Sequence, residues 1–161
     1  DAGYLARLQA AFGWRAGRFR EVGPRSRYAI VRVQAERLAA RRAVLVGNAA
    51  QSLHPIGAQG FNLGLRDALT LVECIAAHRD DPGADAVLST HAARRAEDRA
   101  RTITFSDGLA RATALDHPLA SPARALGLMA LDRDAALRAR LVAGAMGYRG
   151  DVPALCRPEA A

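Results

Sequence analysis

Hydrophobic residues recur every three or four positions along most of the chain, which is the spacing of amphipathic helices. Gly13 would end the first helix, and the pair Ser121-Pro122 is typical of an N-cap followed by a first helical turn. The pattern predicts helices over residues 1–12, 61–78, 85–115, 121–131 and 132–146. In the second of these, the apolar face would consist of Leu65, Leu69, Val72, Ile75 and Ala76.

Three short segments have the composition of strands, namely residues 14–21, 28–34 and 43–46. The last of them is continuously apolar and stops at Gly47, which predicts a fully buried strand of an α/β sheet. Residues 48–60 then form a loop of small and polar residues. The predicted fold class is therefore a helix-rich α/β fragment with about three strands.

The amino-acid composition limits the classes of function that the chain can have. Half of the 161 residues are hydrophobic and only 5% are aromatic, as in a helical chain rich in Ala and Leu. All 23 basic residues are Arg, against 16 acidic residues. These arginines are scattered without interleaved aromatics, so we expect no nucleic-acid partner. On the long helix, a solvent-exposed face would carry Arg94, Arg95, Asp98, Arg99 and Arg101.

The two cysteines match no metal-ligand spacing, so no metal site is predicted. Cys74 fits buried packing on the helix that follows the loop, and both thiols fit a reducing, cytoplasmic compartment.

The segment GNAAQSLHPIGAQGFNLGLRD, which begins at Gly47, carries the chemistry of the chain. A buried strand would deliver the chain into a glycine-rich loop, and this loop opens a helix. Glycines let a flat ligand approach the backbone, while the unpaired amides at a helix start favour an anion or a ring that becomes anionic. The segment is neither a dinucleotide fingerprint nor a P-loop.

This segment resembles the second flavin motif of class A flavoprotein aromatic hydroxylases, the para-hydroxybenzoate hydroxylase fold group. That motif reads G-D-A-A-H, then Pro, then G-Q-G-x-N-x-G-x-x-D. The variant with Asn48 and Gln51 is similar to the ubiquinone-biosynthesis hydroxylases that act on 2-polyprenyl-6-methoxyphenol. The likeness continues through residues 102–109, 126–132 and 145–147.

The resemblance implies FAD as cofactor and assigns site residues. Asn48 would accept hydrogen bonds from the ribityl chain, Pro55 would lie near the isoalloxazine, and the amides of residues 60–62 would meet its pyrimidine edge. His54 is either a general base for a phenol or a loop histidine with a structural hydrogen bond. The implied cofactor-binding set is Gly47, Asn48, Pro55, Gly57, Gln59, Gly60, Phe61 and Asn62. Arg66 and Asp67, on the helix that follows, fit a structural pair or anchors of the loop.

The implied activity is hydroxylation of a polyprenyl phenol in a Rossmann-like FAD/NAD(P)-binding fold. NAD(P)H would reduce the flavin, O₂ would add at C4a, and the hydroperoxide would transfer oxygen to the ring. Residues 1–42 would end the substrate-binding domain, residues 43–82 would belong to the FAD-binding domain, and residues 83–161 would be C-terminal helices. The implied location is the bacterial cytoplasm, with contact to the inner membrane face or to a biosynthetic complex.

Two departures from the family matter. Gly57-Ala58 stands where Ala-Gly is usual, which should alter backbone freedom. The family's N-terminal βαβ unit is absent, so we expect a C-terminal fragment that is inactive alone, holds no FAD tightly and self-associates. The alternative is a non-catalytic helical interaction or assembly module that retains hydroxylase-like sequence.

The last two predicted helices carry a further apolar face, which could dock on the enzyme's own body or lie on a membrane. Arg133 falls on the same face and favours docking on the body. The apolar members of this face are Leu126, Met129, Leu137, Leu141 and Ala145.

Overall fold

A computed structural model describes residues 1–157 of the chain. The chain divides into two compact units, residues 1–30 and the residues from 31 onward. Helices dominate, and each strand is two residues long. The helix-rich α/β class is therefore confirmed, whereas the division into segments ending at residues 42 and 82 stays a prediction.

The first unit consists of helix α1 (Ala2–Phe12) and an irregular segment. As predicted, the helix ends at Gly13, whose φ of 72° is easily reached only by glycine. The side-chain amide of Gln9 donates to the carbonyl oxygen of Gly13 at 2.7 Å and accepts from the backbone N–H of Phe19 at 2.9 Å. The prediction of a strand over residues 14–21 was wrong, because residues 1–30 offer no partner strand and a side chain takes up their backbone groups.

The strands of the second unit form two small antiparallel sheets. Strand β1 (Val33–Gln34) pairs with β4 (Gln51–Ser52), and β2 (Ala39–Ala40) pairs with β3 (Ala43–Val44). The predicted strand over residues 28–34 is thus reduced to its last two residues. None of the described residues forms a parallel sheet, so a Rossmann-like sheet stays a prediction.

The prediction of a buried strand over residues 43–46 was wrong. Only Ala43 and Val44 belong to strand β3; the Leu45 amide still donates to the Leu38 carbonyl at 2.8 Å, but Leu45 keeps 40% of its surface exposed. The strand has a single neighbour in a hairpin, and no described layer covers both of its faces. Strand β4 was also unexpected, because it lies inside the loop predicted over residues 48–60.

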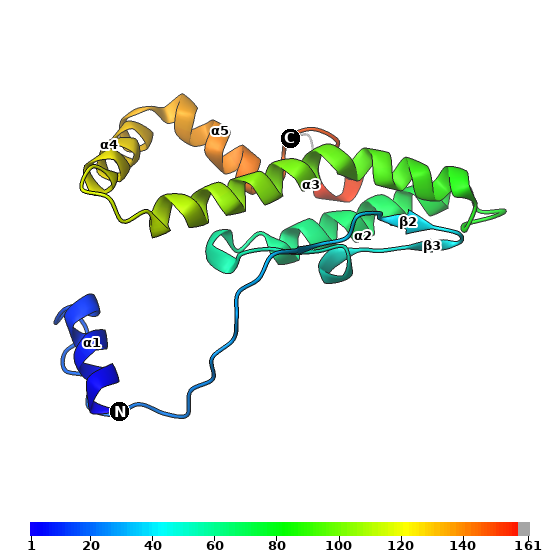
Figure 1. Ribbon diagram of the computed structural model, residues 1–161. Coiled ribbons are helices and arrows are strands. Elements are labelled where there is room, and N and C mark those ends of the chain that lie inside the picture. Colours follow the sequence, from blue (N-terminus) through cyan, green and yellow to red (C-terminus); the bar gives the residue numbers. More distant parts are fainter. Residues whose placement is uncertain (158–161) are drawn as a thin grey trace. The chain divides into compact units, whose positions relative to one another are not determined.

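The helices of the second unit follow the predicted periodicity closely. Helices α2 and α3 lie side by side (Figure 1) and confirm the predictions over residues 61–78 and 85–115. The residue before α4 is Leu119, so Ser121 lies within the helix and is not its cap. Asp134 caps α5 by accepting the amide hydrogens of Ala136 and Leu137. The bounds are Gly60–Ala77 for α2, Asp85–Ala114 for α3, Ala120–Arg133 for α4 and Ala135–Ala145 for α5.

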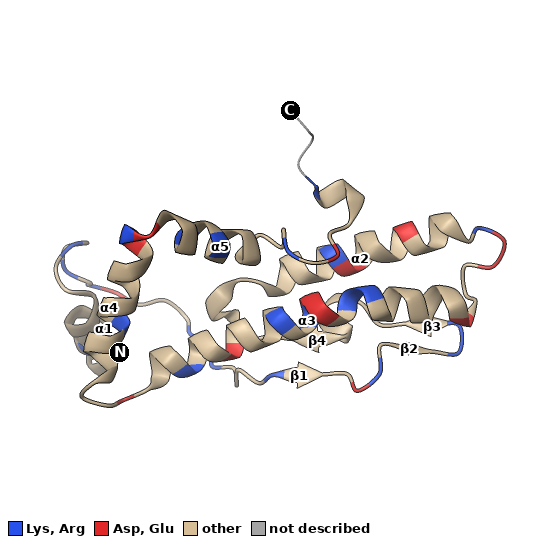
Figure 2. Cartoon of the chain, turned by 90° about the horizontal axis from the view of Figure 1, so that it is seen from above, with Lys and Arg blue, Asp and Glu red and all other residues tan. Residues whose placement is uncertain are grey.

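The interface between α2 and α3 is polar, opposite to the predicted orientation of α2. Two members of its predicted apolar face, Leu65 and Val72, are 48% and 57% exposed. Charged segments of the two helices lie next to each other (Figure 2). The side chains of α2 that are buried are Leu63, Arg66, Asp67, Thr70 and Cys74, which confirms the packing role of Cys74.

Helices α4 and α5 contact each other, but much of their apolar surface faces solvent. Met129 and Leu141 are 44% and 40% exposed, so docking on an enzyme body or a membrane stays a prediction. Within residues 1–157, no helix combines the length and the apolar character needed to cross a bilayer.

Candidate functional site

The glycine-rich segment folds into two single helical turns and one short strand. The 3₁₀ turn η1 (Gly47–Ala49) leads into β4, and a second turn, η2 (Pro55–Gly57), leads to the start of α2. An open cleft of about 480 Å³ lies between η1 and α2. We call it the glycine cleft. Its lining consists of Val46, Gly47, Asn48, Gly60, Phe61, Gly64 and Leu65.

Two glycines bring the loop and the helix into direct backbone contact. Gly47 has a φ of 58°, in the left-handed region, and a Cβ built on Gly64 would lie 3.1 Å from the Gly47 Cα. Any side chain at Gly64 would therefore push η1 away from α2. The pair sets the depth of the glycine cleft.

The start of α2 carries free backbone donors, and two of the three residues that supply them, Gly60 and Phe61, line this cleft. The N–H groups of Gly60, Phe61 and Asn62 precede the first intrahelical bond, which runs from the Leu63 amide to the Gln59 carbonyl at 2.9 Å. Among the described residues these three amides have no hydrogen-bond acceptor. A Cβ at Gly60 would meet nothing within 4 Å, so the space above this residue is open. The helix dipole adds roughly half a positive charge at this point.

The predicted site residues do not all face the same space. Asn48 and Phe61 line the glycine cleft, and Phe61 is 80% exposed. The side chains of Gln59 and Asn62 line two other cavities. A Cβ built on Gly57 would lie 3.7 Å from the Phe105 ring.

The family departure at Gly57-Ala58 has a backbone consequence. Ala58 adopts a left-handed conformation with φ of 49°, where the family usually has glycine. A Cβ in that region costs about 1–2 kcal/mol. The loop holds this strained residue immediately before Gln59 and the start of α2.

His54 makes structural hydrogen bonds. Its Nδ1 accepts the backbone N–H of Ile56 at 3.2 Å, and its carbonyl oxygen accepts from the Ser106 hydroxyl at 2.8 Å. Within the described chain, no carboxylate contacts its ring. This geometry matches a loop histidine, and its role as a general base stays a prediction.

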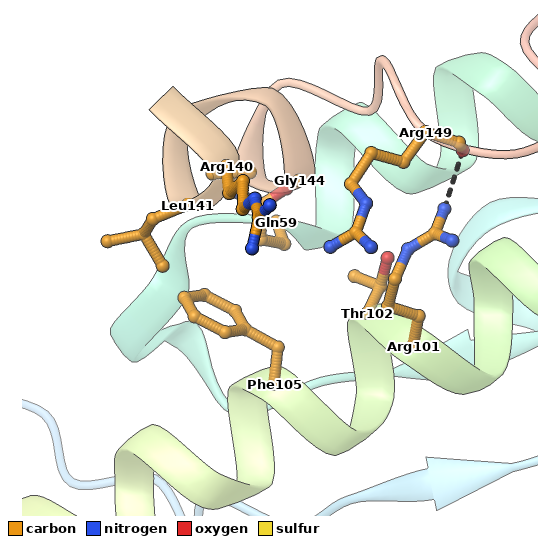
Figure 3. A pocket seen from close by; sticks show the side chains of 9 residues that line it. Gln59, Arg101, Thr102, Phe105, Arg140, Leu141, Gly144 and Arg149 are labelled. Carbon is orange, nitrogen blue, oxygen red and sulfur yellow. Dashed lines mark hydrogen bonds between the residues drawn. The ribbon is translucent and has the colours of Figure 1, made fainter. Parts of the chain in front are cut away.

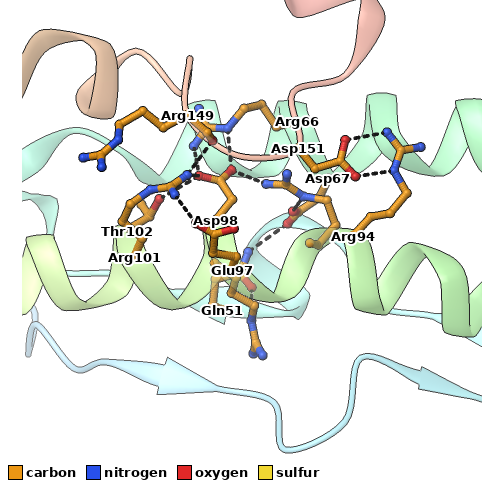
Figure 4. A network of polar contacts seen from close by, with 12 residues as sticks. Gln51, Arg66, Asp67, Arg94, Glu97, Asp98, Arg101, Thr102, Arg149 and Asp151 are labelled. Carbon is orange, nitrogen blue, oxygen red and sulfur yellow. Dashed lines mark hydrogen bonds and ion pairs between the residues drawn. The ribbon is translucent and has the colours of Figure 1, made fainter. Parts of the chain in front are cut away.

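Beneath the loop, α2 and α3 share a buried network of charges (Figure 4). The Arg66 guanidinium donates to Asp98 at 2.7 Å, and the Arg95 guanidinium donates to Asp67 at 2.8 Å. Arg95 also bonds to Asp98, one turn away on the same helix. All four side chains are at most 5% exposed.

Gln51 connects this network to the loop. Its side-chain amide donates to Asp67 at 2.9 Å and accepts from Arg99 at 2.7 Å. Arg99 also donates to the carbonyl oxygens of Ala35 and Ala50, each at 3.0 Å. A neutral amide suits this position because it can donate to an anion on one side and accept from a cation on the other.

These contacts correct two sequence predictions. Arg66 and Asp67 do not pair with each other, since each finds its partner on α3, but Asp67 does anchor the loop through Gln51, as the alternative predicted. Arg95 and Asp98 do not form a solvated face but are 0% and 3% exposed. The sequence did contain one signal for these ion pairs, namely opposite charges near the middle of two consecutive helices. Periodicity within one helix carries no information on the partner helix.

Burial and charge act in opposite directions on this network. Burial would raise the pKa of Asp98, but the hydrogen bonds from Arg66 and Arg95 outweigh it and hold the pKa below its ordinary value. Burial lowers the pKa of the Arg99 guanidinium, which lies close to Asp67. Asp98 therefore stays ionised at neutral pH.

Residues 1–106 match the FAD binding domain family. The chain belongs to this family. It is 38% identical over 147 residues to the ubiquinone hydroxylase UbiL of Rhodospirillum rubrum, covering 89% of this chain and 34% of that protein. It is 34% identical over 114 residues to the uncharacterized protein slr1300 of Synechocystis, covering 69% of this chain and 28% of that protein. The chain thus spans about a third of the length of these curated relatives.

The glycine cleft fits part of an FAD molecule. Backbone approach is unobstructed at Gly60, and the three free amides of residues 60–62 match a group that carries negative charge. Among the described residues the side chain of Asn48 makes no hydrogen bond, so its amide is free to accept from a hydroxyl.

Proposed function

We propose that the full-length protein is an FAD-dependent monooxygenase that hydroxylates a polyprenyl phenol in ubiquinone biosynthesis, with NAD(P)H and O₂ as co-substrates. The observation that carries the proposal is the row of free amides at the start of α2, which opens onto the glycine cleft. Family membership and the likeness to a ubiquinone hydroxylase support it.

This chain would hold the flavin ring and stabilise its charge. The amides of residues 60–62 and the α2 dipole favour negative charge at the pyrimidine edge, and Asn48 binds the ribityl chain. Bound FAD supplies the redox and oxygen chemistry. Gln51 and Arg99 fix the loop from below, so that the cleft keeps its shape when the ligand enters.

His54 is the proposed proton acceptor for the phenol, with a constraint from its geometry. Since Nδ1 accepts from Ile56, the neutral ring carries its proton on Nε2. Proton uptake therefore requires that the bond to Ile56 break. If a His54→Gln variant hydroxylates the phenol with an unchanged pH profile, His54 is not the proton acceptor.

The Rossmann-like sheet, the polyprenyl substrate and a position at the inner membrane face belong to the same proposal. A long apolar tail would keep the substrate in the membrane, so the enzyme would meet it from the cytoplasmic side. We further propose that the chain by itself is inactive and binds FAD weakly, because further FAD contacts would come from the rest of the full-length protein.

The decisive experiment substitutes Gly60 in the full-length, FAD-loaded protein. A Gly60→Val side chain enters open space, so the fold should be kept while the flavin is displaced. We expect FAD affinity at least tenfold weaker, a lower reduction potential for the flavin that remains, and loss of hydroxylation. Arg79→Ala, beyond the far end of α2, is the matched control and should change neither quantity.

Equal effects of the two substitutions, or none at Gly60, would show that the glycine cleft does not hold the flavin. A full-length protein that binds no FAD at all would favour the non-catalytic interaction module instead.

A further inference from the structure

A second, smaller cavity lies on the other side of the loop. It has a volume of about 110 Å³ and is bordered by α3, α5, the segment after α5 and the junction of η2 with α2. We call it the arginine cavity. Its lining includes Gln59, Arg101, Phe105, Arg140, Leu141 and Arg149.

The arginine cavity combines apolar and cationic side chains, with Arg140 beside Gln59 (Figure 3). Figure 3 shows Phe105 and Leu141 at one end, with the guanidinium groups of Arg101 and Arg149 at the opposite end. Such a division suits a ligand that has both an apolar part and a charged part.

Its positive charge is only partly neutralised. Arg101 pairs with Glu97 at 2.8 Å and with Asp98 at 3.2 Å. Within residues 1–157, the side chains of Arg140 and Arg149 have no acidic partner and no hydrogen bond. Two guanidinium groups that share a cavity without a carboxylate between them repel each other, and a bound anion relieves that repulsion.

The arginine cavity is distinct from the glycine cleft. Gln59 turns its side chain into the arginine cavity, whereas the next residue, Gly60, lines the glycine cleft. The Gln59 side chain is 9% exposed and has no partner among the described residues, so its amide is available to a ligand. One cavity can therefore be filled without the other.

We propose that the arginine cavity binds a small organic oxyanion. Its carboxylate or phosphate group lies between Arg140 and Arg149, and an apolar part of a few carbons packs against Phe105 and Leu141. Gln59 donates a further hydrogen bond through its amide. This site does not depend on the proposed hydroxylation.

Calorimetric titration of the full-length protein with three probes tests the proposal. Butyrate carries both parts of the ligand, 1-butanol lacks the charge, and inorganic phosphate lacks the apolar part. We expect butyrate to bind with a Kd of about 1–10 mM, as a ligand of six non-hydrogen atoms can. Both other probes should bind at least fivefold more weakly.

Substitutions then locate the site. The double variant Arg140→Gln/Arg149→Gln should weaken butyrate binding at least tenfold, and it should fold normally because both side chains are exposed. Arg138→Gln is the matched control on the same helix. The Arg138 guanidinium contacts the Asp132 carbonyl and does not line the cavity, so its loss should change the Kd less than twofold.

Four outcomes of these titrations would overturn the proposal. The first is no binding of butyrate at about 50 mM, roughly fivefold above the weakest expected Kd. The others are equal binding of butyrate and 1-butanol, equal binding of butyrate and phosphate, and unchanged binding in the double variant. Competition between butyrate and FAD would also overturn it, since it would place the anion in the glycine cleft. If the Gly60→Val experiment contradicts the proposed function, the butyrate titrations still test the arginine cavity independently.

Discussion

Asp98 is the residue on which the buried network depends most. It accepts hydrogen bonds from Arg66 and Arg95, and all three side chains lie in the interior. Removing one partner of a buried ion pair leaves the other charge uncompensated, which costs more than the pair contributes when intact. Helix α2, which carries the motif residues, is thus held to α3 by ion pairs at a position where helices usually pack through hydrophobic side chains.

We expect Asp98→Asn to lower the free energy of unfolding by about 3–5 kcal/mol, because it leaves the buried Arg66 guanidinium without an anionic partner, while Arg95 keeps only Asp67. Glu97→Gln is the control, since Glu97 is 74% exposed and its loss should cost less than about 1 kcal/mol. Urea denaturation at pH 7 measures both. Equal losses would mean that Asp98 is not the centre of the network.

The burial of the His91 ring lets us predict how the stability of the fold depends on pH. It is 1% exposed, its Nε2 hydrogen-bonds the Asp67 carbonyl at 3.1 Å, and Arg94 and Arg95 lie near it. Burial, aided by these cations, lowers the pKa of His91 below its ordinary value, although the Asp67 contact acts the other way. The folded protein therefore keeps the ring neutral, whereas the unfolded chain takes up a proton below about pH 6.5.

The ordinary pKa of histidine, about 6.5, applies to the unfolded chain. The stabilisation that depends on neutral His91 is therefore complete above about pH 6.5 and is lost as the pH falls through the lower pKa of the folded state. We expect His91→Gln to reduce the difference in unfolding free energy between pH 7.5 and pH 5, measured by urea titration at both values. His117→Gln, at an exposed position, should retain that difference. The same pH dependence in His91→Gln and the unmodified chain would contradict the assignment.

At the scale of elements, α2 buries charged side chains against α3 and leaves part of its predicted apolar face exposed, although Leu63 is buried. Its contact with α3 uses Arg66, Asp67 and Thr70, whereas Leu65 and Val72 face solvent. Its other contact is with η1, through the close approach of two glycine backbones. The loop and the helix are therefore joined by backbone contact.

The contact between η1 and α2 predicts opposite effects for two glycine substitutions. Gly64→Ala would place a Cβ 3.1 Å from the Gly47 Cα, and we expect a loss of about 1–3 kcal/mol as the loop moves away. Gly127→Ala, within α4, meets nothing within 4 Å and should gain about 0.5–1 kcal/mol from helix propensity. Chemical denaturation compares the two, and a gain at both positions would contradict the tight contact.

At the scale of the whole molecule, exposed apolar surface is extensive. On α2, Phe61, Leu65 and Val72 recur at helical spacing and are all exposed. Contiguous apolar surface of this kind usually marks an interface. No described element covers it.

We expect the 161-residue chain to self-associate through this face of α2, giving at least twice the mass of one chain by light scattering at high concentration. Val72→Asp should shift the distribution toward the monomer, because a carboxylate in an apolar interface loses its hydration. Thr90→Asp, at an exposed position of α3, is the control and should have no effect. A clean monomer for the unmodified chain would refute the prediction.

The sequence by itself determined the features that depend on neighbouring residues. The lengths of α2 and α3 follow from bonds between residues four apart, and the end of α1 follows from the left-handed preference of Gly13. The resemblance in the glycine-rich segment also predicted FAD, and family membership agrees with it. The roles of His54 and Asn48 stay predictions, because no ligand-bound geometry tests them.

Only the tertiary structure decided which faces are buried and which strands pair. Arg66 finds Asp98 across 32 residues, and Arg99 reaches the Ala35 carbonyl across 64, so neither contact leaves a trace in a helical period. An arginine on a helix looks solvated until a carboxylate on another helix meets it. Its burial is set by that partner, because a charge leaves water only where an opposite charge or a carbonyl replaces the lost hydration.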